Sequence, residues 1–129
     1  ELLKIIEKSI PGKLREKNSH PAKRTFQAIR IEVNHELDIL ESSLNDAFDL
    51  LNVGGRLVVI TFHSLEDKIV SNVFKKLCSD DESTKRLPFV PEELKAKAKM
   101  IVKLTPSEDE INENNRSRSS KLRVIERVR

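Results

Sequence analysis

The stretch from Gly54 to Asp67 constrains the fold more than any other part of the sequence. It joins a Gly-Gly turn, an almost wholly apolar segment at 57–62 and a polar stretch. Because the apolar segment does not alternate with polar residues, it predicts a strand buried on both faces, as in a parallel sheet. Ser64 and Asp67 then predict a helix N-cap with an acid in the first turn. Ligands of open α/β sheets bind beyond the carboxyl ends of the strands, where His63 and Ser64 fall.

Apolar residues at steps of three and four predict three amphipathic helices around this βα unit. The first covers 1–10 and is stopped by Pro11-Gly12. The second runs without a break from Phe26 to Leu51, roughly 38 Å at the rise of an α-helix, and ends before the Gly-Gly turn. The third covers 65–77. The basic segment 13–24 is predicted to be a connector.

In the last third of the chain, predicted loops alternate with short predicted helices and strands. Residues 79–98 predict a surface loop with at most a short helix near 92–98. A strand is predicted at 100–104, and Thr105 to Glu108 resembles a capping box with Pro106 at the first helical position. A polar loop at 114–120 precedes a last strand at 122–128.

Composition limits the cellular setting and the cofactor chemistry. The chain has three glycines, too few and too scattered for a glycine-rich nucleotide loop. Its single cysteine, Cys78, excludes an internal disulfide, and neither a signal peptide nor an apolar run of membrane length is present. We therefore expect a reduced, soluble, cytoplasmic protein. Because the chain begins at Glu1 and its only methionine is Met100, we also expect it to be part of a longer protein.

Positive charge is concentrated in two blocks, at 13–30 and 116–129, although the net charge is only +3. Such blocks suit contact with phosphate, and ordinary solvated faces are the alternative explanation. The cations of the first block are Lys13, Arg15, Lys17, Lys23, Arg24 and Arg30, and those of the second are Arg116, Arg118, Lys121, Arg123, Arg127 and Arg129.

Three separated sequence blocks carry a family resemblance. They are HPAKRTFQAIRI at 20–31, GGRLVVITFHSLEDKIV at 54–70 and NRSRSSKLR at 115–123. In this order they closely resemble the C-terminal half of the bacterial small-subunit ribosomal RNA (cytosine-N4)-methyltransferases, the RsmH/MraW type. The resemblance covers residues 1–78 and 99–127. It departs from the family pattern at Asn115, where proline is common.

The resemblance implies an α/β fold, the C-terminal part of a class I (Rossmann-like) S-adenosylmethionine-dependent methyltransferase sheet whose final strand is antiparallel. Residues 1–24 would be the end of a helical substrate-binding insert and a basic connector, and 25–129 the C-terminal half of the methyltransferase domain. The implied reaction methylates the exocyclic N4 amine of a cytidine in small-subunit (16S) ribosomal RNA. The S-adenosylmethionine ligands would lie upstream of Glu1, with none in this chain. The implied partner is small-subunit ribosomal RNA or the ribosomal subunit.

Six residues are candidates for the site. His63 is the catalytic candidate, because imidazole can accept a proton near neutral pH, and a structural histidine that orients the turn is the alternative. Ser64 fits a helix cap better than a nucleophile. Asn34 could bond either the backbone or the substrate, and the two arginines of the 115–123 block could form surface ion pairs instead. The residues predicted to contact RNA are Arg24, Asn34, Ser64, Arg116 and Arg118.

Other functional classes remain as alternatives. A non-catalytic basic module could dock onto RNA or an acidic protein, although the absence of Tyr and Trp weakens stand-alone RNA binding. His20 and His35 lack partners at metal-ligand spacing, so no metal site is expected. The strand at 57–62 should lack a neighbour along one edge. We therefore expect self-association or binding to the missing N-terminal half.

Overall fold

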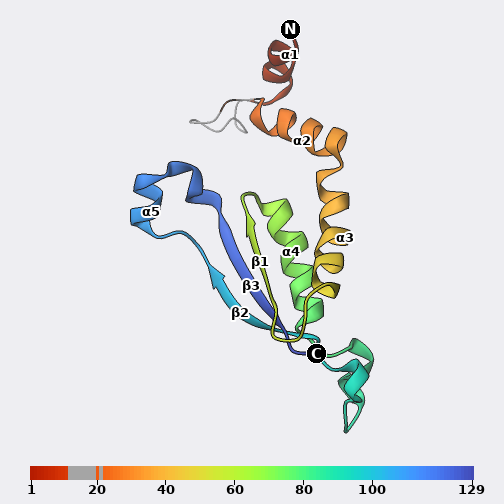
Figure 1. The fold of residues 1–129 in the computed structure, drawn as a ribbon. Helices are drawn as coiled ribbons and strands as arrows, with labels where there is room; N and C mark the ends of the chain where they lie inside the picture. Colours follow the sequence, from red (N-terminus) through yellow and green to blue (C-terminus); the bar gives the residue numbers. More distant parts are fainter. Residues whose placement is uncertain (12–19, 21) are drawn as a thin grey trace. The chain divides into compact units, whose positions relative to one another are not determined.

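The computed structural model describes residues 1–11, 20 and 22–129, and it divides into two compact units, Glu1–Glu36 and Leu37–Arg129. The first unit holds helices α1 (Leu2–Ser9) and α2 (Lys23–Asn34) (Figure 1). Helix α1 confirms the helix predicted at 1–10. Most of the predicted connector 13–24 lies outside the described residues, and Lys23 already belongs to α2.

The single long helix predicted from Phe26 to Leu51 is wrong. The chain instead forms α2 and then α3 (Glu36–Asp49), separated by His35 in the left-handed conformation, with φ 51° and ψ 34°. The carboxylate of Glu36 stabilises this break, because it accepts hydrogen bonds from Arg30 Nε at 2.9 Å and Asn34 Nδ2 at 3.1 Å. Apolar residues recur every three or four positions on both sides of His35, so their periodicity cannot reveal a helix break at this single residue.

The second unit is built on a three-stranded sheet in the order β1-β3-β2 (Figure 1). Its strands are β1 (Arg56–Thr61), β2 (Ala98–Leu104) and β3 (Lys121–Arg127). Strand β3 is antiparallel to both neighbours, which confirms the predicted antiparallel last strand. Consequently β1 and β2 end where β3 begins. We call that side the carboxyl end of the sheet, and the opposite side, where β3 finishes, the amino end.

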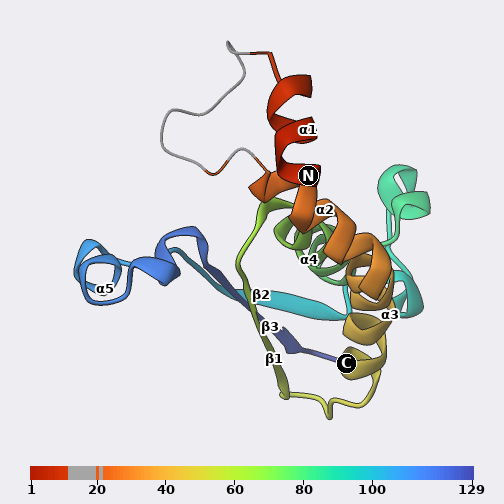
Figure 2. The same ribbon diagram turned by 90° about the horizontal axis from the view of Figure 1, so that it is seen from above.

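Helices α3 and α4 (Ser64–Leu77) lie on the same face of this sheet (Figure 2). Between them and the strands lies the hydrophobic core, in which Phe48 and Phe74 are the largest fully buried side chains. Fully burying a side chain of this size contributes about 1.5–3 kcal/mol. The buried members of the core are Leu44, Phe48, Val70, Val73, Phe74, Ala98 and Ile125.

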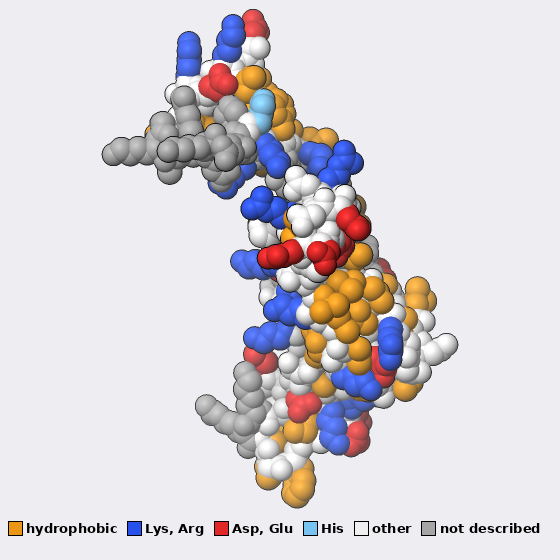
Figure 3. Space-filling model, turned by 90° about the vertical axis from the view of Figure 1, so that its left-hand side faces the viewer, with side chains coloured by type: hydrophobic (Ala, Val, Ile, Leu, Met, Phe, Trp, Pro, Cys, Tyr) orange, Lys and Arg blue, Asp and Glu red, His pale blue; other side chains and the backbone are white. Residues whose placement is uncertain are grey.

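The other face of the sheet is apolar and exposed. Val58 is 58% exposed, and Ile60 and Leu104 are each 56% exposed. In Figure 3, which shows the left-hand side of the molecule in Figure 1, hydrophobic side chains gather in the lower half. The prediction that the strand at 57–62 is covered on both faces is therefore not met within the described residues. Strand β1 keeps an apolar sequence suited to two covered faces, but helices of this unit cover only one.

The connections are short helical turns. The region 79–98 contains two 3-10 helices, η2 (Glu82–Arg86) and η3 (Glu92–Leu94). Helix α5 (Glu108–Glu113) is capped by Ser107, whose Oγ accepts a hydrogen bond from the backbone N–H of Glu110. Thr105 is therefore not the cap, and Pro106 precedes the cap instead of opening the helix. The polar loop predicted at 114–120 is another 3-10 helix, η4 (Asn115–Ser119). None of the described helices is long and apolar enough to cross a membrane.

Candidate nucleic-acid interface

His63, immediately beyond β1, is the N-cap of α4. Its backbone is extended, and its Nδ1 accepts a hydrogen bond from the backbone N–H of Glu66 at 3.3 Å. In return, the Glu66 carboxylate accepts from the backbone N–H groups of Phe62 at 2.9 Å and His63 at 3.3 Å. Ser64 was predicted to be the cap, but it is the exposed first residue of α4. The prediction missed that a histidine nitrogen can accept this bond.

The capping contact also determines which ring nitrogen of His63 carries the hydrogen in the neutral form. Because Nδ1 accepts, the neutral ring carries its hydrogen on Nε2. That atom lies 3.1 Å from Oε1 of Glu66, but no hydrogen bond of good geometry engages it within the described residues. The structure therefore gives His63 the turn-orienting role that the sequence left open. Nε2 is the ring nitrogen without a hydrogen bond, but it is buried in this structure, and the catalytic role stays a prediction.

A buried ion cluster lies beside this cap. Asp67 accepts hydrogen bonds from Arg123 Nε at 2.9 Å and from Lys121 Nζ at 2.8 Å. Arg123 is nearly fully buried, with 6% of its side chain exposed. Its guanidinium and the Lys121 ammonium lower the pKa of Asp67 to about 2, although burial opposes the shift. The cluster ties the first turn of α4 to β3. The sequence predicts Asp67 only as an acid in the first turn of the helix, because its partners lie more than fifty residues away.

Arg116 and Arg118 lie on η4, directly before β3, and both are exposed. Within the part of the chain that the structure describes, neither side chain has a hydrogen-bond or ion-pair partner. Ser117 between them is buried, and its Oγ donates to the backbone oxygen of Asn114 at 2.8 Å. The side chain of Asn114 in turn accepts from the backbone N–H of Arg116. The turn is thus fixed from inside while two arginines stay free to bind anions.

The remaining arginines of the second basic block are used within the fold. Arg127 Nη1 donates to the backbone oxygens of Phe48, Asp49 and Leu51 at 3.3, 3.0 and 2.9 Å. Its guanidinium carbon also lies 5.4 Å from the Phe48 ring centroid. Arg127 therefore caps the C-terminus of α3. Together with buried Arg123, it does not belong to the phosphate-binding block that the sequence suggested.

Two predicted RNA contacts, Arg24 and Asn34, belong to the unit Glu1–Glu36 and are described within it alone. Arg24 is exposed in the first turn of α2. Asn34 is exposed at the end of that helix, and its amide donates to Glu36. Asn34 thus has a structural bond, although to a carboxylate and not to the backbone that the sequence offered as the alternative. The other candidates, His63, Ser64, Arg116 and Arg118, all lie in the second unit.

A cavity of about 680 Å³ lies far from His63, around the C-terminal end of α4. Lysines such as Lys75 and Lys95 and acids such as Asp80 and Glu93 line it together, and none of the predicted site residues does. Its lining contains no glycine, so it offers no loop for the methyl donor. Across the described residues, no three His, Cys, Asp or Glu side chains are grouped to hold a metal ion.

Comparison with known proteins matches residues 1–128 to the MraW methylase family. Ribosomal RNA small subunit methyltransferase H of Lactobacillus delbrueckii subsp. bulgaricus is 53% identical over 130 residues, covering 99% of this chain and 41% of the relative. The proteins of the same name from Clostridioides difficile and Exiguobacterium sibiricum are 52% and 47% identical, and 42% of each is covered. The chain therefore spans about two fifths of the length of these curated relatives.

Proposed function

Because the chain belongs to the MraW methylase family, we propose that it works as the C-terminal part of a longer enzyme that methylates small-subunit ribosomal RNA. The observation that carries this proposal is the family match over residues 1–128. The fold agrees, since the order β1-β3-β2 with an antiparallel β3 is the C-terminal end of a class I methyltransferase sheet. The domain boundary predicted between residues 24 and 25 remains part of the proposal.

The methyl group would come from S-adenosylmethionine bound elsewhere in the full-length protein. The three glycines of this chain cannot form a glycine-rich loop, so no donor ligand is assigned here. What this chain contributes is the carboxyl end of β1, where Nε2 of His63 is buried without a hydrogen bond, and the basic turn η4.

The proposed acceptor is the exocyclic N4 amine of a cytidine. Its lone pair is conjugated with the ring and is weakly nucleophilic, so the enzyme must align the amine with the methyl carbon and place acceptors around it. The base must also leave its stack. We assign base contact to His63, because its Nε2 is, with Thr61 Oγ1, one of two buried polar side-chain atoms at the strand end that have no hydrogen bond in the described structure.

The phosphate backbone of the RNA would lie along η4. Arg116 and Arg118 carry this proposal, since both are exposed and neither is paired within the described chain. Arg24, Asn34 and Ser64 remain proposed RNA contacts. Of these, Asn34 has the weaker case because its amide already bonds Glu36.

The exposed apolar face and free edge of β1 favour contact with more protein. We propose that the rest of the full-length enzyme covers them, with self-association as the alternative. This surface would also serve a non-catalytic docking module, which would bind RNA without any dependence on a methyl donor.

Mass spectrometry of nucleosides tests the function. The full-length protein is incubated with small ribosomal subunits and isotope-labelled S-adenosylmethionine, and the RNA is digested. We expect labelled N4-methylcytidine, and none when the donor is left out. Label on another nucleoside would contradict the proposed acceptor, and RNA binding without any transfer would favour the docking module.

A further inference from the structure

The helix-facing side of the sheet carries three neighbouring cations at its carboxyl end. Arg123 on β3 lies directly opposite Lys103 on β2, and Lys121 lies two residues before Arg123. Residues opposite each other, or two apart on one strand, point to the same face. Lys103, Lys121 and Arg123 therefore form one group, which we call the basic row.

The basic row has more positive charge than its surroundings neutralise. Two of its three cations bond a carboxylate, since Asp67 binds Lys121 and Arg123. Lys103 is exposed and has no ion-pair partner within the described chain. The row and Asp67 together carry a net charge of +2, from three positive charges and one negative. Like charges directly opposite on neighbouring strands destabilise a sheet, so this arrangement opposes folding.

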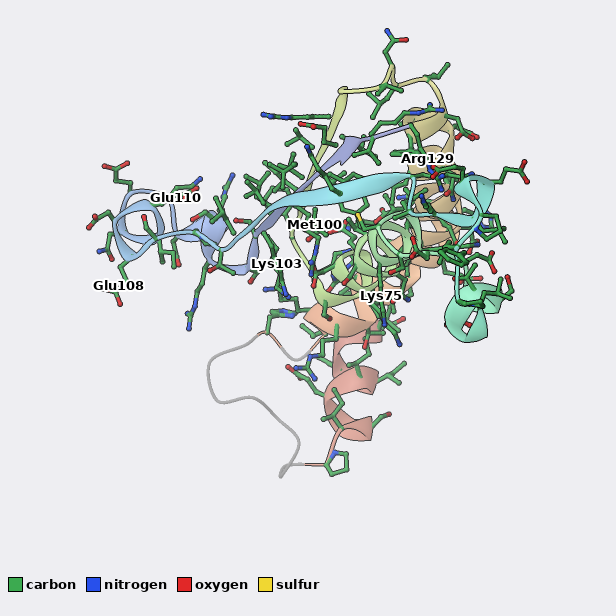
Figure 4. All side chains as sticks on the ribbon, turned by 90° about the horizontal axis from the view of Figure 1, so that it is seen from below. Lys75, Met100, Lys103, Glu108, Glu110 and Arg129 are labelled. Carbon is green, nitrogen blue, oxygen red and sulfur yellow. The ribbon has the colours of Figure 1, made fainter. Side chains whose placement is uncertain are left out.

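At the amino end of the same sheet, the two cations that flank the central strand are both paired, although this row also keeps a net charge of +1. There Glu126 on the central strand lies between Arg56 and Lys99, and its carboxylate binds them at 2.9 and 2.7 Å. Positive and negative side chains alternate across the three strands. Lys103 and Arg129 mark the two ends in Figure 4. A lysine left without an ion-pair partner in the described chain, at the end where α/β sheets bind ligands, indicates a functional role.

We propose that Lys103 and Lys121 each bind a backbone phosphate of the RNA substrate, near Arg116 and Arg118. This inference rests on the proposed function. Lys121 follows η4 after one residue, Ser120, so it belongs to the chain segment that presents the two free arginines. RNA phosphate is the fitting anion, because two flexible ammonium groups recognise charge without reading a base.

Asp67 and Arg123 make this binding possible without disrupting the fold. The Lys121 side chain is 40% exposed, so its ammonium can turn from Asp67 to a phosphate. Asp67 then keeps its bonds to Arg123 Nε and Nη2, and the partly buried carboxylate is never left unpaired. Asp67 and Arg123 are thus positioning residues, and each of the two lysines binds a phosphate.

The test compares two variants of a full-length family enzyme that carries this chain. The double variant Lys103→Gln/Lys121→Gln removes the proposed contacts, and Lys99→Gln removes a paired cation at the amino end as a matched control. Binding to a small-subunit ribosomal RNA transcript is measured between about 0.05 and 0.2 M salt. The double variant should reduce the slope of log affinity against log salt by about 1.4–1.8. At about 0.15 M salt this corresponds to a loss of about 15- to 30-fold in affinity.

The control should keep the parental slope, and all three proteins should bind S-adenosylmethionine equally. A parental slope in the double variant, or an equal reduction in Lys99→Gln, overturns the phosphate subsite. So does a loss of donor affinity with unchanged RNA binding. If the parent neither binds nor methylates the RNA, the proposed function itself fails. Should the double variant not fold, Lys103→Gln alone still decides, with an expected slope reduction of about 0.7–0.9.

Discussion

The two ends of the sheet use the same kinds of residue in opposite ways. At the amino end, Arg56 and Lys99 flank Glu126, and Arg127 is bonded to the carbonyls that end α3. At the carboxyl end, Arg116 and Arg118 have no partner within the described chain, and two further cations share Asp67. The position of the nearest acceptor, and not the type of residue, therefore separates a structural cation from one that can bind a ligand.

The source of the acceptor explains this difference. Glu126 lies on the central strand, where a neighbouring cation on each side is within reach. Asp67 comes from the first turn of α4, above the sheet, and it reaches only part of the basic row. The carboxylate of Asp67 can therefore tie α4 to β3 at that end without neutralising the charge of the basic row. Variants that remove Glu126 or Asp67 therefore test the difference between the two ends of the sheet.

The largest expected loss of stability comes from Asp67→Asn. Because Arg123 is nearly fully buried, removing its charge partner should lower the free energy of unfolding by about 3–5 kcal/mol. Chemical denaturation of the full-length protein measures this loss. Glu126→Gln is the control, since its partners Arg56 and Lys99 are more than half exposed, and it should cost at most about 1 kcal/mol. Equal losses would mean that the two ends are not different.

Acid should weaken the same cluster. The pKa of Asp67 falls from 3.8 to about 2 on folding, so the folded state favours the ionised carboxylate. The resulting stabilisation is fully present above the unfolded pKa and is lost as the pH falls from about 4 through about 2. Denaturation midpoints across this range should fall more steeply for the parent than for Asp67→Asn. Parallel curves would remove Asp67 as a source of the pH dependence.

Replacing Arg127 with methionine probes the amino end. The variant loses charge-assisted hydrogen bonds to three carbonyls at the end of α3, and we expect a stability loss of about 2 kcal/mol. The salt dependence of RNA binding should not change, because the guanidinium is already bonded within the protein. A reduced salt slope with unchanged stability would place Arg127 in the interface and break the comparison.

His63 is expected to have both a structural role, as the cap of α4, and a role in methyl transfer. His63→Ala removes the α4 cap and should cost about 1 kcal/mol, whereas His63→Asn keeps a capping oxygen and should restore most of that stability. If His63 also contacts the base, both variants should lower the single-turnover rate of methyl transfer. A normal rate in His63→Asn would leave the residue with its capping role alone.

The sequence predicts the helices and strands of this chain better than the residues that cap or interrupt them. All three strands and the helices at 1–10 and 65–77 were placed within about two residues, because apolar patterns repeat over a whole element. The errors fall on single residues. His35 interrupts a helix whose apolar spacing continues through it, and His63 replaces Ser64 as the cap because a ring nitrogen accepts the bond.

Long-range contacts account for the rest. The second basic block looked uniform in sequence, yet Arg123 and Arg127 bond groups more than fifty residues away, whereas Arg116 and Arg118 bond none that the structure describes. Asp67 is predicted only as an acid in the first turn of its helix for the same reason. Charge runs predict where cations are, but only the fold determines which of them keep a free charge.

The smallest effect on folding is expected from the double variant Arg116→Gln/Arg118→Gln. Both side chains are exposed, and the turn is held by Asn114 and Ser117, so stability should change by no more than about 0.5 kcal/mol. RNA binding should nevertheless weaken, with the salt slope reduced by about 0.7–0.9 for each lost phosphate contact. Donor affinity should stay the same. A variant with the parental slope would show that free cations at the carboxyl end do not by themselves form an RNA interface, and the difference between the two ends would then concern stability alone.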